Sequence, residues 1–221
     1  MPISPADFSA IFKEGARYQW PSGDILRIEL REAGKLQLPT GYLVARDNST
    51  SVIEPSDVTQ AFVDRVSSGG YPVVLAIANF EKPVYGARPR VAAAKVVISQ
   101  AVTVSWEPAL RPSQKVADLA PDSFYGFPVD SGQGCYLDVS LLPFLQAAQR
   151  DETQLDIARD EVMENCHAEL TDPQTGGNVL LFDCGMGDGL YPTWTGRAAD
   201  GSITCFATDL ELLSHSSGSL P

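Results

Sequence analysis

The chain has 221 residues, of which 44% are hydrophobic and 20% charged, a composition typical of a globular protein with a sizeable core. Sixteen Lys and Arg against 28 Asp and Glu give a formal net charge of −12. A negative field of this size opposes binding to nucleic acid or to an anionic membrane surface, and it leaves cations and basic proteins as partners.

Four cysteines are spread too widely to form a C-x-x-C metal or redox pair, and they are too few for a disulfide framework in a chain of this length. We therefore expect four free thiols. The first residues lack the basic start and apolar run of a signal peptide, and no run of about 18 apolar residues occurs anywhere. These features predict a soluble, cytoplasmic protein that does not enter a membrane.

The first third of the chain predicts a helix, two or three strands and a second helix. Apolar residues recur at helical spacing within residues 3–14, and apolar and polar residues alternate from residue 23 to residue 46, as in half-buried strands. A helix of about three turns is expected from Pro55 to the Gly69-Gly70 pair. The residues that define its apolar face are Val58, Ala61, Phe62 and Val66.

Three apolar runs predict interior strands, at residues 72–80, 90–106 and 177–183. Each run is bounded by Gly, Pro or Asn, and its backbone is best hydrogen-bonded inside a sheet. Prolines scattered over residues 108–123 predict a surface loop between the runs. The side chains expected to be mostly buried are Val74, Leu75, Val96, Val97, Leu180 and Leu181.

Residues 140–170 carry the strongest helical pattern, with an apolar stripe and acidic residues pointing away from it. A solvated face explains these acids better than a cation site does. Elsewhere strands follow one another without steady alternation with helices, which predicts an α+β fold whose core is a largely antiparallel β-sheet with a few flanking helices. We expect a single domain over residues 1–213 and a flexible tail over residues 214–221.

Two passages combine glycine and aspartate beside apolar strands, at residues 127–138 and 183–192. Glycine lets the backbone approach a ligand, and aspartate beside a turn can hold a hydroxyl or a cation. The alternative is two tight turns, and whether the passages meet in space stays open. The candidates for one pocket are Asp130, Asp138 and Asp188 as catalytic residues and cation ligands, Asp209 as a further cation ligand, and Gly132, Gly134, Gly187, Gly189, Tyr191 and Trp106 as substrate-binding residues.

Standard templates do not match these passages. No lysine follows Gly132-Gln-Gly134 as in a phosphate-binding loop, and the spacing of a dinucleotide fingerprint or a calcium hand is absent. Cys135 with His167 could form a thiol nucleophile and its base, but a small buried side chain is the favoured interpretation of Cys135.

Five segments spread over the chain carry a resemblance to a known family. They are Gly69–Val73, Val104–Glu107, Tyr125–Cys135 with Asp138, Gly185–Pro192, and Thr208-Asp209. Together they resemble a bacterial domain-of-unknown-function family, number 4241, in the same order and over most of residues 41–213. The resemblance implies a single-domain, mostly bacterial, cytosolic protein with no assigned catalytic residue.

Two functional hypotheses follow. In the first, the aspartates hold one divalent cation that activates water against a small phosphate- or acyl-type substrate, because close carboxylates need a cation or proton to offset their repulsion. In the second, the charge of −12 guides association with a basic protein, as in an immunity protein that blocks a basic toxin. A single concave cluster of aspartates favours the first hypothesis, and acids spread over a flat or convex face favour the second.

Overall fold

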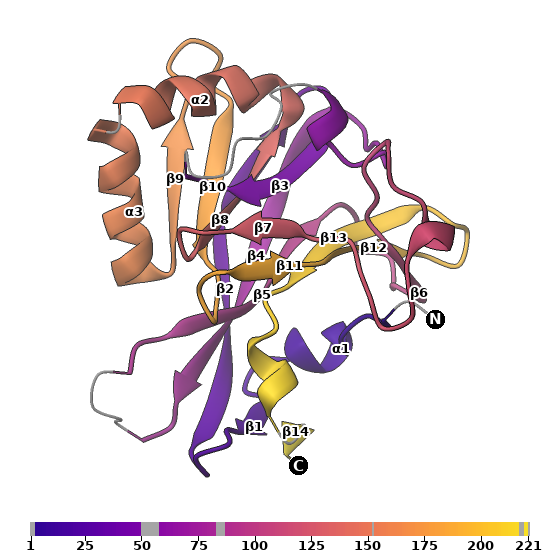
Figure 1. Cartoon of the computed structure of the whole chain (residues 1–221), viewed down its shortest axis with the longest axis vertical. Coiled ribbons are helices and arrows are strands. Elements are labelled where there is room, and N and C mark those ends of the chain that lie inside the picture. The colour runs from indigo at the N-terminus through magenta and orange to yellow at the C-terminus, as the bar shows by residue number, and fades with distance from the viewer. Residues whose placement is uncertain (1–2, 50–57, 83–86, 152, 217–218, 221) are drawn as a thin grey trace.

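The computed structural model describes residues 3–49, 58–82, 87–151, 153–216 and 219–220, which form two antiparallel sheets with helices on the outside (Figure 1). The fold is α+β in a single domain, as the sequence predicts. Within these residues no helix is both long enough and apolar enough to cross a membrane.

The larger sheet has eight strands, and the long strands β2 and β4 pair along most of their length. A bulge between Glu32 and Gly34 shifts their register by one residue, which bends β2 so that its second half packs against the smaller sheet. In order across the sheet, the strands are β14 (Ser219–Leu220), β1 (Arg17–Gln19), β2 (Ile25–Leu38), β4 (Gly69–Phe80), β5 (Arg90–Val97), β13 (Ile203–Asp209), β12 (Thr193–Arg197) and β6 (Ser105–Pro108).

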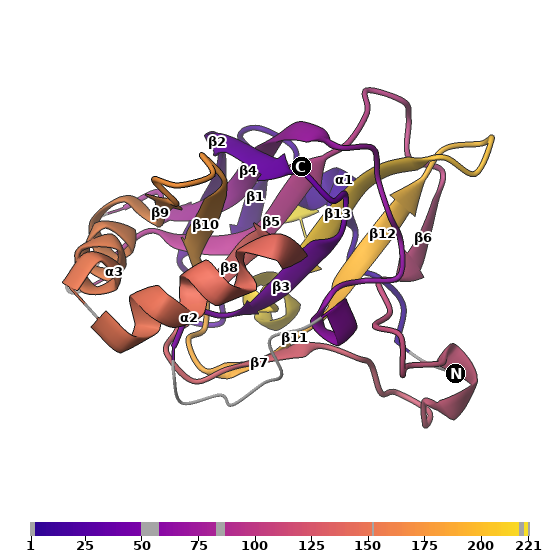
Figure 2. The same cartoon turned by 90° about the horizontal axis from the view of Figure 1, so that it is seen from above.

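The smaller sheet has four strands, and two further strands form a separate ribbon between the sheets and the solvent (Figure 2). Across the smaller sheet the order is β3 (Leu43–Asp47), β8 (Gln133–Asp138), β10 (Asn178–Asp183) and β9 (His167–Thr171), and the ribbon pairs β11 (Gly189–Tyr191) with β7 (Phe127–Val129). The helices are α1 (Phe8–Ile11), α2 (Leu142–Asp151) and α3 (Thr153–Asn165), with single 3-10 turns η1 (Val58–Gln60), η2 (Val116–Asp118), η3 (Val139–Leu141) and η4 (Leu212–His215).

The core has three layers because both sheets are covered on both faces. Alternate residues of β8 point to opposite sides: Tyr136 packs between the two sheets, whereas Cys135 and Leu137 pack beneath α2 and α3. The outer face of the large sheet is covered by α1 and η4, with Phe8 and Leu212 in the third cluster.

The predicted interior strands are confirmed in outline. Residues 72–80 lie in β4 and residues 178–183 form β10, but the run over residues 90–106 ends as a strand at Val97, and a separate short strand begins at Ser105. Of the six side chains expected in the core, Leu75, Val96, Leu180 and Leu181 are buried, whereas Val74 and Val97 are half-buried.

Two helix predictions are wrong in part. Residues 58–66 contain only the single turn η1, and Phe62 instead donates its backbone N–H to Leu43 O. Residues 50–57, including Pro55, lie outside the described residues. The helical pattern over residues 140–170 ends as a helix at Asn165, because Cys166 takes a φ of 67° and starts the turn into β9.

The C-terminal residues also differ from the expected flexible tail. The turn η4 extends to His215, and β14 pairs with β1 at the edge of the large sheet. Residues 217, 218 and 221 lie outside the described residues.

Candidate functional site

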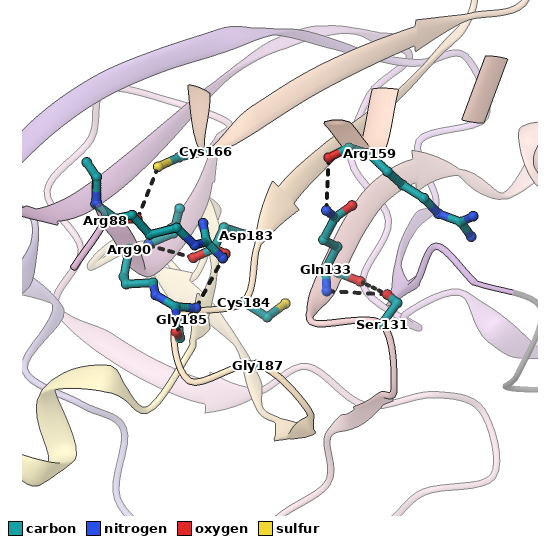
Figure 3. Close-up of polar contacts among 12 residues, drawn as sticks. Arg88, Arg90, Ser131, Gln133, Arg159, Cys166, Asp183, Cys184, Gly185 and Gly187 are labelled. Atoms are coloured by element: carbon teal, nitrogen blue, oxygen red, sulfur yellow. Dashed lines mark hydrogen bonds and ion pairs between the residues drawn. The ribbon is translucent and has the colours of Figure 1, made fainter. Parts of the chain in front are cut away.

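The two glycine-aspartate passages meet in space. The backbone N–H of Cys184 donates to Gly132 O at 2.9 Å, and β11 pairs with β7 so that Gly189 lies opposite Val129. The loops after β7 and β10 therefore lie side by side, with the residues of both labelled in Figure 3. This answers the question that the sequence left open.

Glycine is required at this junction by close packing. A Cβ on Gly134 would lie 2.9 Å from the ring of Phe182, and a Cβ on Gly185 would lie 2.7 Å from Val91 O, both shorter than real Cβ contacts. Gly185 also has a φ of 30°. These two glycines are explained by packing alone.

The buried carboxylate at the first passage belongs to Asp47, at the end of β3, and not to Asp130. Asp47 accepts hydrogen bonds from the backbone N–H of Asp130 at 2.5 Å, from the N–H of Ser131 at 3.1 Å and from Ser131 Oγ at 3.0 Å, and a further one from the N–H of Ser49. The Asp130 side chain is exposed. With its oxygens already occupied by donors, Asp47 closes the loop and is not poised to bind a cation.

A chain of amides connects this loop to the helices. Asn48 Nδ2 donates to Gln133 Oε1 at 2.9 Å, and Gln133 Nε2 donates to Arg159 O of α3 at 3.1 Å. From α2, Gln149 Nε2 donates to Asn48 O at 3.1 Å. Since Asn48, Gln133 and Gln149 are buried, this network fixes α2 and α3 against the sheet. Figure 3 shows the link from Gln133 to Arg159.

Asp138 lies at the opposite end of β8 from the glycine loop. Asp138 is five residue steps along the strand from Gln133, which is about 17 Å at ~3.4 Å per residue. Its carboxylate is fully buried and accepts hydrogen bonds from Thr40 N at 2.9 Å and from Ser140 N and Oγ at 2.9 and 2.7 Å. Asp138 is therefore the cap of η3, and its predicted place in a pocket with Asp130 and Asp188 is wrong.

The remaining predicted residues also fail to converge. Asp188 is exposed on the second loop, while Asp209 lies at the end of β13, where burial raises the pKa of its carboxyl to about 6. Within the described ranges, no group of three or more His, Cys, Asp and Glu side chains could hold a metal ion. The predicted four-aspartate cation site is therefore not formed, because each aspartate stands on a different strand end or turn.

The two aromatic residues predicted to bind substrate, Tyr191 and Trp106, lie in different places. Tyr191 is buried at the loop junction, where its hydroxyl donates to Gly187 O at 2.7 Å. Trp106 packs on Phe8 of α1, with ring centroids 4.6 Å apart, in the cluster on the outer face of the large sheet. Gly132, Gly187 and Gly189 lie at the loop junction with Tyr191.

All four cysteines are free and buried, as the sequence predicts. Burial raises the pKa of the Cys166, Cys184 and Cys205 thiols, which keeps them protonated at neutral pH. Cys135 of β8 and His167 of β9 lie on either side of β10, where Cys135 is opposite Leu181 and His167 is opposite Phe182. Because neighbouring residues of a strand point to opposite faces, only Cys135 faces the helices.

Sequence reasoning missed a cluster of two arginines beside the second passage. Arg88 Nη2 contacts Asp183 Oδ1 at 2.6 Å, Arg90 Nη1 lies 3.9 Å from the same oxygen, and Arg90 Nη1 donates to Gly185 O at 3.1 Å (Figure 3). The Asp183 side chain is only 1% exposed, and its burial raises the pKa of the carboxyl, an effect that the two guanidinium groups partly offset. The sequence feature that could have revealed this cluster is the spacing of Arg88 and Arg90, because residues i and i+2 of an extended chain point to the same face.

A second feature is the outer face of α3, which lies at the edge of the molecule (Figures 1 and 2). Leu155, Ala158 and Val162 bury the inner face. The opposite face carries four exposed acids and two exposed apolar side chains, Ile157 at 66% and Met163 at 51% exposure. The acids are Asp156, Asp160, Glu161 and Glu164.

Comparison with known proteins places most of these elements in one family. A family model described as a protein of unknown function (DUF4241) matches residues 36–208, from the last residues of β2 to the penultimate residue of β13. No curated protein and no solved structure matches the chain. The matched span includes both glycine-aspartate passages, the arginine cluster and α3, and the chain belongs to the DUF4241 family.

Proposed function

We propose that this protein is a cytoplasmic, acidic binding protein that takes a basic protein partner on the outer face of α3, as an immunity protein that blocks a basic toxin would. The observation that carries the proposal is the mixture of exposed acids with Ile157 and Met163 on one helix face. Charges speed the encounter and select the partner, while exposed apolar side chains supply contact area that excludes water.

Within this face, three acids are available for a partner. Asp156 is paired with Arg159 at 3.0 Å, whereas Asp160, Glu161 and Glu164 make no ion pair with a described residue. A convex helix that leaves carboxylates unpaired fits the binding hypothesis better than the enzyme hypothesis, which requires them in a concave site.

The cation-assisted hydrolase has weaker support. It depends on Asp130, Asp138 and Asp188 sharing one pocket, and Asp138 is instead held by Thr40 and Ser140 at the far end of β8. A hydrolase with this donor set would need its cation elsewhere, and the described residues offer no group of three ligands for one.

The test compares two charge-reversed variants of equal net charge. Asp160→Lys with Glu161→Lys and Glu164→Lys alters the α3 face, and Glu32→Lys with Asp118→Lys and Asp188→Lys alters exposed acids elsewhere. We expect the wild type and the second variant to capture a protein of high pI from an extract of the native cells, and the α3 variant to lose it. The association rate of the purified pair should fall as salt rises, because exposed charges are screened over about 10 Å at 0.1 M salt.

Two results would contradict the proposal. One is capture of the same proteins by the α3 variant and the wild type. The other is the absence of any basic protein that the wild type retains and the α3 variant does not. A neutral variant, Asp160→Asn with Glu161→Gln and Glu164→Gln, distinguishes the effect of removing the negative charges from the effect of adding positive charges.

A further inference from the structure

A cavity of about 270 Å³ opens beside the arginine cluster, on the opposite side of the molecule's sheets from α3. Its walls come from the ends of β2 and β4, from the loop after β10 and from η4. The walls are mostly apolar, and the two guanidinium groups provide the charge. The side chains that shape it are Trp20, Phe80, Arg88, Arg90, Met186 and Leu212.

The charge in this cavity is positive, in contrast with the net charge of the chain. Two guanidinium groups lie within 4.0 Å of one carboxylate, that of Asp183, which is the ion-pair partner they share among the described residues. Two positive charges against one negative charge leave an excess of one. A buried or half-buried guanidinium is favourable only when anions and hydrogen-bond acceptors surround it.

Hydrogen bonding at the cluster is also incomplete. Nη1 of Arg88 is buried and has no acceptor among the described residues. Buried N–H groups are almost always hydrogen-bonded in native structures, so this nitrogen marks a guanidinium whose hydrogen bonds are not all made. Because Nη1 of Arg88 is itself covered by protein, a ligand in the cavity would bind the other guanidinium nitrogens of Arg88 and Arg90. Guanidinium groups bind carboxylates and phosphates through parallel hydrogen bonds, which identifies the class of acceptor.

The apolar walls of the cavity determine which organic group can carry the anionic group of the ligand. The indole of Trp20 and the ring of Phe80, both half-buried, provide flat apolar surfaces, and Met186 at 50% exposure lies at the rim. The volume lies just below the range of about 300–1,000 Å³ found for drug-sized ligands, which limits the ligand to about one ring.

We propose that this cavity binds a small organic acid, with its carboxylate or phosphate group against Arg88 and Arg90 and an apolar body of about one ring between Trp20 and Phe80. The site is independent of the α3 face, so either can fail without the other. The cavity would then be a positively charged binding site on a protein whose net charge is negative.

The probes are phenylacetate and phenyl phosphate, with phenylacetamide as the neutral match for phenylacetate. Binding is followed by the shift of the Trp20 indole N–H resonance, assigned with Trp20→Phe, at constant salt. A ligand of about ten non-hydrogen atoms at ~0.3 kcal/mol per atom has a millimolar Kd. We expect at least one anion to bind in that range or more tightly, and phenylacetamide to bind about tenfold more weakly, as expected for loss of a charge-assisted contact. The two anions distinguish a carboxylate site from a phosphate site.

A pair of rim variants keeps the test independent of folding. Met186→Glu places a carboxylate in front of the guanidinium groups and should weaken anion binding about tenfold, whereas Met186→Gln, of similar length and no charge, should leave it within about twofold. Because Met186 is on the surface, both variants should fold. Arg90→Gln should also weaken binding, and Arg150→Gln on α2 is the control for loss of one positive charge.

Three results would overturn the proposal. These are equal affinity for phenylacetate and phenylacetamide, unchanged anion binding in Met186→Glu, or no shift of the Trp20 resonance with either anion at about 20 mM, a concentration above the expected Kd.

Discussion

Individual aspartates in this protein differ in what they do because their neighbours differ. Asp47 and Asp138 are buried acceptors for backbone and hydroxyl donors, Asp183 is an ion-pair partner, and Asp130 and Asp188 are exposed. Asp209 differs from all of these because its half-buried carboxyl has no ion-pair partner among the described residues, and burial raises the pKa of that carboxyl from 3.8 to about 6.

The raised pKa of Asp209 predicts how stability depends on pH. Between its ordinary pKa and about 6, the folded protein holds this proton more tightly than the unfolded chain does, so this carboxyl lowers stability as pH rises through that range and the loss persists at higher pH. Asp209→Asn should remove the loss while keeping an acceptor for the N–H of Glu211. We expect the variant to be more stable by roughly 1–3 kcal/mol at pH 8 and by much less at pH 4.

Urea denaturation of both proteins across this pH range measures the difference directly. A difference in unfolding free energy that does not change with pH would show that Asp209 titrates normally.

At the scale of single elements, the backbone of the loop after β10 packs closely against neighbouring backbone at Gly185. Gly185 brings the backbone against Val91 and Leu210, and the same loop supplies Gly185 O to Arg90 and Met186 to the cavity rim. The turn thus fixes the position of the arginine cluster relative to the large sheet.

Gly185→Ala should destabilise the protein strongly. The new Cβ would lie 2.7 Å from Val91 O and 3.2 Å from Leu210 O, so the loop must move. We expect a loss of more than about 2 kcal/mol. Gly201→Ala is the matched control, with a φ of 81° and no atom within 4 Å of its Cβ, and it should cost only about 1 kcal/mol for its backbone conformation. Equal losses in a denaturant titration would mean that close packing at Gly185 contributes nothing.

At the scale of the whole molecule, the two faces of the sheet pair carry different surfaces. Helices α2 and α3 cover one side and present acids outward, while α1 and η4 cover the other side, where the arginine cluster borders a cavity. The two proposed sites, one for a basic protein and one for a small organic acid, therefore lie at distinct locations on one acidic protein.

Carboxylates do not converge within the part of the chain that the structure describes, and this predicts the response to divalent cations. Thermal denaturation with Mg²⁺, Mn²⁺ or Ca²⁺ should give midpoints within about 1 °C of the metal-free protein, because a ligand that does not bind the native state cannot stabilise it. Asp188→Asn should behave in the same way. A cation-dependent rise that Asp188→Asn abolishes would restore the hydrolase hypothesis.

Local patterns were sufficient for most of the fold. Runs such as residues 72–80 and 178–183 are apolar over a full strand length and are bounded by Gly, Pro or Asn, so that their backbone groups are best satisfied inside a sheet, and they were predictable. The failed predictions fall where one pattern suits two structures. Apolar residues from Val162 to Leu170 continue at helical spacing, but Cys166 turns the chain, and Leu170 belongs to a strand whose alternate residues face the helices.

The sequence by itself determined the charge, the strand segments, the free thiols and the α+β class, because these depend on composition and on periodicity along the chain. Only the tertiary structure decided which side chains meet. Asp130 and Asp138 are eight residues apart in sequence, yet a strand of about 17 Å separates the loop of one from the other. Arg88 and Asp183 are 95 residues apart and lie in contact, since β5 and β10 belong to different sheets that pack face to face. Carboxylates near turns look alike in sequence, and the donors around each one, supplied by distant strands, determine what it does.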